Sequence, residues 1–136
     1  MGQQQLLLLI LAAIIVGIAI VMGINMFGEN AVQANQDAVT QDVLTIASRA
    51  QGWYRRPAQM GGGGRNFAAS GNNVSLDKLN FAGTNDNGTY VLSSIAGGSF
   101  VITGTGTEDG DSDTQPLQVQ VTVYPDSVGT MSYPEP

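Results

Sequence analysis

An uninterrupted run of apolar residues, residues 6–24, dominates the start of the chain. At a rise of about 1.5 Å per residue, its nineteen residues form a helix of roughly 28 Å, close to the ~30 Å hydrocarbon core of a bilayer. The first charged residue is Glu29 and the first proline is Pro57, so no helix breaker follows the run. The pattern predicts one helix to about Arg55, with a first part, residues 1–27, that we call the apolar half.

The second part of this helix, residues 28–56, is predicted to be amphipathic, and we call it the amphipathic half. Its apolar residues recur at spacings of three, four and seven, which places them on one stripe: Val32, Val39, Val43, Ile46, Ala50 and Trp53. Arg55 and Arg56 suit the negative end of a helix dipole, and Pro57 disfavours helical geometry at the residue before it. We expect the helix to end here and its stripe to cover a hydrophobic sheet.

Residues 89–136 have the pattern of an antiparallel sheet. Residues 90–95 and 99–105 are β-prone segments joined by an Ala-Gly-Gly turn. Residues 117–124 alternate between apolar and polar side chains, which predicts a half-buried strand. A short edge strand is expected around residues 129–133.

The segment between helix and sheet, residues 57–88, is rich in glycine and asparagine. It contains four consecutive glycines at residues 61–64, interpreted as a flexible connector, and an Asn-Asp-Asn-Gly turn sequence at residues 85–88. The sequence therefore predicts an α+β fold, in which one long N-terminal helix packs through its amphipathic half on a small antiparallel sheet.

The residue composition narrows the chemistry. The chain has no cysteine and no histidine, which removes disulfides, thiol nucleophiles, the usual general base and the commonest metal ligand. We therefore expect that it is not an enzyme. From residue 57 onward, eight acidic residues face only Arg65 and Lys78, and this acidic balance argues against nucleic-acid binding.

Two simpler interpretations of the apolar half are weighed against the pattern. A cleaved signal peptide is disfavoured because the run exceeds the ~7–15 residues of a signal core and no Lys or Arg precedes it. A single-span membrane anchor fits the length, but no flanking Lys or Arg fixes its orientation. A basic leader already removed from the chain would account for that gap.

The start Met1-Gly2-Gln3-Gln4-Gln5 running into the apolar half, the amphipathic stripe, and the order of loop and sheet together resemble the type IV pilins and the related pseudopilins. The resemblance implies a structural subunit, a major pilin, that polymerises through its N-terminal helix into an extracellular filament. It also implies partners: identical subunits in a helical homopolymer, the pilus assembly machinery, and a prepilin peptidase. The unassembled subunit would reside in the inner membrane, and its N-terminal amine would be a methylation site.

The chain departs from the family pattern in three ways. Pilins usually carry a glutamate five residues into the mature chain, where Gln5 stands if Met1 is the mature N-terminus and Leu7 stands if Gln3 is. The helix-breaking proline of many members is also missing, and two glycines of the apolar half are then the candidates for local unwinding: Gly17 and Gly23. The disulfide-closed C-terminal loop of the family is excluded because cysteine is absent.

The physical chemistry of the apolar half favours a filament independently of this resemblance. In water such a surface must be covered, and a bundle of identical helices covers it while backbone hydrogen bonds stay internal. Heterologous contacts that do not close into a ring generate a helical fibre. We expect the filament core and its assembly contacts at Gln5, Leu6, Leu9, Ala13, Val16, Ile20, Ile24 and Phe27.

Residues 108–113 form an acidic loop with carboxylates at alternate positions, which makes three residues calcium candidates: Asp109, Asp111 and Asp113. The sixth and twelfth positions from the first of them are Thr114 and Gln120, so the loop is not an EF-hand. We expect a solvated hairpin loop and no cofactor, although some pseudopilins hold calcium in a C-terminal loop. Two Asn-x-Ser/Thr sequons on predicted turns are candidate glycosylation sites: Asn73 and Asn87.

Two alternative functions stay open. Within the same superfamily, the chain would be a pseudopilin of a type II secretion-type system, an assignment that calcium binding would favour. From another class, it would be a monomeric binding module on a single-span anchor. Such a module needs no continuous helix beyond the membrane, whereas this sequence predicts one.

Overall fold

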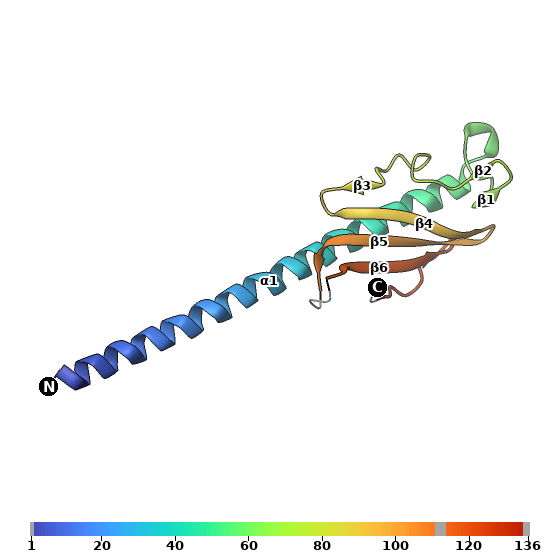
Figure 1. Ribbon diagram of the computed structural model, residues 1–136. Coiled ribbons are helices and arrows are strands. Elements are labelled where there is room, and N and C mark those ends of the chain that lie inside the picture. The colour runs from blue at the N-terminus through green and yellow to red at the C-terminus, as the bar shows by residue number, and fades with distance from the viewer. Residues whose placement is uncertain (1, 111–113, 135–136) are drawn as a thin grey trace.

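The computed structural model describes residues 2–110 and 114–134 and has the predicted α+β fold (Figure 1). One helix is followed by a short 3-10 helix and two antiparallel sheets. In chain order the elements are α1 (Gly2–Arg55), η1 (Ala58–Met60), β1 (Ala68–Ala69), β2 (Asn72–Asn73), β3 (Thr84–Asn85), β4 (Gly88–Ala96), β5 (Ser99–Asp109) and β6 (Pro116–Val123).

Helix α1 is continuous over 54 residues, about 81 Å at a rise of about 1.5 Å per residue. It ends at Arg55, two residues before Pro57, as the sequence predicts. Figure 1 shows that the amphipathic half lies along the sheet, whereas the apolar half projects away from it. One unbroken helix therefore joins a free segment to a folded domain.

The main sheet has the strand order β3-β4-β5-β6, with every neighbouring pair antiparallel. The predicted hairpin is confirmed: β4 and β5 pair through Ala96 and Ser99 and are joined by two glycines. β5 is longer than expected and runs on to Asp109, past the register irregularity that follows Thr105. β1 and β2 form a small separate sheet.

The core lies between α1 and the inner face of the sheet. Five of the six predicted stripe residues are buried and Val32 is half-buried, so the amphipathic interpretation is confirmed. The sheet supplies the opposing buried residues, chiefly Phe100, Ile102, Val119, Val121 and Val123. Gly104 of β5 lets the helix approach closely, because a Cβ there would lie 2.7 Å from Cγ1 of Val39 and 3.1 Å from Cγ2 of Val43.

The glycine run at residues 61–64 packs against the end of α1, a role that the sequence interpretation missed. The indole Nε1–H of Trp53 donates to the carbonyl of Gly61 at 3.1 Å, and the amide of Gly63 donates to the carbonyl of Trp53 at 2.9 Å. A Cβ on Gly63 would lie 2.6 Å from the indole ring. The segment therefore folds over the only tryptophan of the chain.

The segment after β6 folds back along that strand. The amide of Gly129 donates to the carbonyl of Thr122, and Ser132 exchanges two backbone hydrogen bonds with Gln120. These pairings are isolated bridges, so the expected edge strand around residues 129–133 is reduced to local contacts. They nevertheless close the free edge of β6.

Candidate assembly surface

The apolar half of α1 is an exposed hydrophobic surface. Sixteen large apolar side chains between residues 6 and 27 are each 53–78% exposed in the single chain. They occur on all sides of the helix, and a helix that is apolar all round is normally buried in protein or membrane. This surface therefore needs a partner from outside the chain.

The residues predicted for the filament core all lie on this surface. Leu6, Leu9, Val16, Ile20, Ile24 and Phe27 are among its exposed apolar side chains, and Gln5 and Ala13 are also helical and exposed. From Leu6 onward their spacing of three or four residues places them on one stripe of α1, and Gln5 lies four residues before Leu9. Gly17 and Gly23 are helical in the single chain, so unwinding at them stays a prediction for the assembled state.

Among the described residues, one helix is long and apolar enough to cross a membrane. Its most apolar 18-residue window has a mean hydropathy of 3.2, and none of that window is buried by the rest of the chain. Length and composition therefore suit a lipid environment as well as a helix bundle.

A polar junction joins α1 to the end of the sheet from which the apolar half projects. The side-chain amide of Asn35 donates to the carbonyl of Asn87 at 2.8 Å, and its Oδ1 accepts from the amides of Thr107 and Glu108. One asparagine thus holds both the β3–β4 turn and the end of β5. These contacts fix the direction in which the helix leaves the domain.

A second polar contact lies deeper along the same helix. Oδ2 of Asp42 accepts hydrogen bonds from Asn85, Asn87 and the Tyr90 hydroxyl, at 2.9, 2.9 and 2.5 Å. Burial raises the pKa of Asp42, but the three hydrogen bonds lower it by more, so its net pKa lies below the ordinary value. Burial and the hydrogen bond to Asp42 raise the pKa of Tyr90. The carboxylate therefore stays ionised and joins the helix to β3 and β4.

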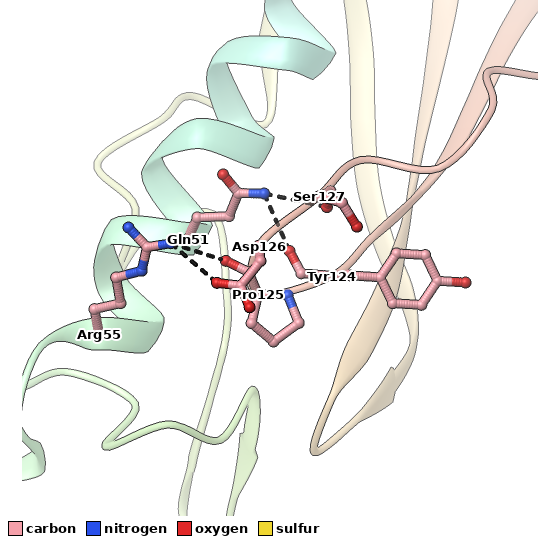
Figure 2. A network of polar contacts seen from close by, with 6 residues as sticks. All are labelled: Gln51, Arg55, Tyr124, Pro125, Asp126 and Ser127. Atoms are coloured by element: carbon pink, nitrogen blue, oxygen red, sulfur yellow. Dashed lines mark hydrogen bonds and ion pairs between the residues drawn. The ribbon is translucent and has the colours of Figure 1, made fainter.

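The far end of α1 is joined to the segment after β6, as Figure 2 shows. The side-chain amide Nε2 of Gln51 donates to the carbonyls of Tyr124 and Ser127, at 3.1 and 3.2 Å. Arg55 lies 3.1 Å from the carboxylate of Asp126, an exposed ion pair that adds little stability. The amphipathic half is thus attached to the domain by polar contacts from Asn35 to Arg55.

The sequence analysis did not identify Asn35, Asp42 or Gln51. A signal for Asp42 was available, because it directly precedes Val43 and so borders the buried stripe. A carboxylate at that position needs hydrogen-bond donors when the stripe is covered. The Asn-rich turn at residues 85–88 contained those donors, but only the fold brings them together.

The two sequon asparagines differ in how accessible their side chains are. Asn73 is exposed on β2. Nδ2 of Asn87 is the atom that donates to Asp42, and the side chain is half-buried, so a glycan on that atom would disrupt the junction. Of the two candidates, Asn73 has the more accessible side chain.

The calcium candidates fall only partly within the described residues. Asp109 ends β5, and its Oδ2 accepts the amide hydrogen of Thr114 at 2.8 Å. Asp111 and Asp113 lie outside the described residues. Across residues 2–110 and 114–134 no group of three carboxylates is placed to hold a metal ion.

No protein-family model matches the chain, and searches of curated proteins and of solved structures found no match. What the structure shows is a long N-terminal helix, apolar in its first half, on an antiparallel sheet. This architecture is compatible with a pilin-like fold.

Proposed function

We propose that this chain is the structural subunit of a pilin-like extracellular filament, with the apolar halves of many copies forming its core and the sheet domains its surface. The observation that carries the proposal is the single continuous helix α1. Its apolar half is exposed, and its amphipathic half is packed on a folded domain. A rigid helix of this kind transmits the position of the core directly to the outer domain.

The energetics favour such an assembly. Burying sixteen large apolar side chains at about 1.5–3 kcal/mol each gives tens of kcal/mol before the entropy of association is subtracted. Transfer from lipid to a helix bundle is nearly neutral, since both surroundings are apolar. A subunit held in the inner membrane before assembly would therefore enter the filament without a large desolvation penalty.

The resemblance to pilins supplies the remaining parts of the proposal. A prepilin peptidase would remove a leader, the new N-terminal amine would be methylated, and assembly machinery would extract the subunit from the membrane. No acidic residue lies in the first turn of α1, so docking of an N-terminal amine would use a neutral acceptor. Gln5 is the candidate, because its side-chain oxygen accepts a hydrogen bond without the cost of a buried charge.

The pseudopilin and the anchored binding module are the alternatives. Both share the apolar half, but a monomeric module does not need α1 to continue rigidly from the anchor into the domain. A catalytic role has little support, since the chain lacks histidine and cysteine. The continuity of α1 is therefore the feature that favours the filament.

Imaging of purified surface filaments tests the proposal. Filaments that contain this chain by mass spectrometry should give a cryo-EM map with a helical core built from residues 6–27 and sheet domains outside. A map with the sheet domain in the core, or surface filaments lacking this chain, would refute it. A short basic leader encoded upstream of the codon for Met1 would support it further.

A further inference from the structure

Every basic residue of the chain lies at one end of the sheet domain. The five are Arg49, Arg55, Arg56, Arg65 and Lys78. Three of them, Arg49, Arg56 and Lys78, line an open depression of about 370 Å³ beside Trp53. The other two flank a second depression near Asp126. We call this surface, at the end of α1 that lies farthest from the apolar half, the basic end.

The opposite end of the domain, where α1 leaves the sheet, carries acidic residues and no basic ones. Its exposed or half-buried acidic residues among those described are Glu29, Asp37, Asp86, Glu108 and Asp109, and Asp42 lies about one to two turns deeper along α1, bonded to Asn87. An open crevice of about 820 Å³ separates α1 from the end of β5, and Glu29, Glu108 and Asp109 line it together with apolar atoms of Ile24 and Val32. We call this the neck crevice.

The separation of charge is nearly complete along the axis of α1. At the basic end, Asp126 is paired with Arg55, and Asp77 is the other acidic residue among those described. No Lys or Arg lies before residue 49 or after residue 78. The domain is therefore a charge dipole. The basic end of one copy would attract the acidic end of another, and two like ends would repel each other.

The symmetry of a filament decides which ends meet. In a polar homopolymer all copies point the same way. The acidic end of one domain therefore faces the basic end of another in a heterologous contact. Two copies docked head to head would instead bring like-charged ends together. We infer that the neck crevice of one copy receives the basic end of the next, so that Arg56 and Arg65 lie against Glu29 and Glu108. This inference rests on the proposed filament and names the contact between its outer domains.

The two arginines are suited to this contact. Both are exposed, and a guanidinium group can hold a carboxylate through two parallel hydrogen bonds. Apolar atoms of Ile24 and Val32 lie beside the carboxylates of the crevice and exclude some water from around a guanidinium inserted there. The apolar core would supply most of the affinity, and the end-to-end contact would set the axial register of the domains.

Paired charge reversals in the full chain test this contact. Glu29→Lys with Glu108→Lys should lower the amount of purified filament on the order of tenfold, because two like-charged surfaces then meet. Arg56→Glu with Arg65→Glu should have the same effect. The chain with all four substitutions should recover most of the filament, because each new lysine then faces a new glutamate. Trp53 fluorescence on each variant verifies that the domain folds.

The matched control is Asp77→Lys with Asp126→Lys, which makes the same change of net charge at the basic end. It should assemble at least as well as the unmodified chain. The inference is overturned if this control loses filament as strongly as the neck variant, or if the fourfold variant does not recover.

Should the unmodified chain form no filament, the proposed function fails and the docking contact with it. Should all charge variants assemble normally, only the docking contact fails. In a cryo-EM map, the expected result is Arg56 or Arg65 within about 4 Å of Glu29 or Glu108 of the neighbouring copy.

Discussion

The two halves of α1 have the same backbone conformation and opposite relations to the rest of the chain. The amphipathic half buries one stripe against the sheet, with Val39, Val43 and Ile46 fully inaccessible. In the apolar half, residues 2–27 as the structure describes them bury no large side chain, although this half is far more hydrophobic. Burial in this chain therefore follows the pattern of the side chains and not their average hydropathy, since only a one-sided pattern matches a one-sided sheet.

This difference assigns the two halves to different equilibria. Packing of the amphipathic half stabilises the single chain, and its loss should appear as unfolding. None of residues 2–27 belongs to the domain core, so substitutions there should appear only in membrane insertion or assembly. Identical substitutions placed in both halves make this comparison measurable.

A charge in the apolar half should have the largest effect. Ala13→Glu should abolish filament formation, because an unpaired carboxylate in a packed apolar core costs several kcal/mol for every subunit. Trp53 fluorescence should report an unchanged unfolding transition of the domain. Electron microscopy of surface preparations and a denaturant titration in detergent measure the two outcomes.

The matched control for that substitution is Ala34→Glu, which introduces the same side chain at an exposed position of the amphipathic half. It should change neither assembly nor unfolding by much. Equal loss of filament in both variants would contradict the assignment of the core to residues 6–27.

Truncation of an isoleucine should lower the stability of the domain in the amphipathic half and leave it unchanged in the apolar half. Ile46→Ala removes a fully buried side chain and should lower the free energy of unfolding by about 2–5 kcal/mol. Ile14→Ala, at a position that is 54% exposed, should leave the unfolding of the domain within about 0.5 kcal/mol of the unmodified value. Urea titration monitored by Trp53 distinguishes them, and a large effect of Ile14→Ala would show that the apolar half contacts the domain in solution.

The fold was largely predictable because its patterns are local. The stripe from Val39 to Trp53 has helical spacing, residues 117–124 alternate, and two glycines mark the hairpin turn, so each element follows from neighbouring residues. Val32 was expected to be buried and is half-buried, because it lies at the end of β5 and lines the open neck crevice. Ala47 was missed, since a small residue adds little to a hydrophobic pattern.

The polar junctions could not be predicted because they depend on registers between distant segments. Asp42 and Tyr90 are 48 positions apart, and Gln51 and Tyr124 are 73 positions apart. The packing role of the glycine run has the same origin, since Trp53 fills the space that a side chain on Gly63 would need. The clustering of all five Lys and Arg residues at one end of the domain also depends on the fold, because only the fold brings residues 49–56 and 65–78 together.

Adding one methyl group should have an intermediate effect that again differs between regions. Gly104→Ala places a Cβ 2.7 Å from Val39 and should destabilise the domain by about 1–3 kcal/mol through overpacking. At Gly17 a Cβ meets no atom within 4 Å, so Gly17→Ala should leave the unfolding of the domain unchanged and favour the helix by about 1 kcal/mol. Fluorescence measures the first effect and circular dichroism of the full chain the second. A stable Gly104→Ala domain would mean that α1 can move away from β5.

The smallest expected effect concerns the ionised contact that only the amphipathic half has. Because hydrogen bonds hold the pKa of Asp42 below its ordinary value of about 3.9, the folded state binds a proton less readily than the unfolded state. The stability that this carboxylate contributes is therefore fully present above about pH 4 and is lost as the pH falls through the lowered pKa.

Asp42→Asn should lower the free energy of unfolding by about 1 kcal/mol at pH 7, because neutral hydrogen bonds replace charge-assisted ones. Asp37→Asn removes the same charge from an exposed position of the same helix and should stay within about 0.5 kcal/mol of the unmodified chain. Unfolding followed by Trp53 fluorescence between pH 7 and pH 3 should show the Asp42→Asn difference shrinking below pH 4. A difference that stays constant over this range would mean that the side chain contributes through packing and not through its charge.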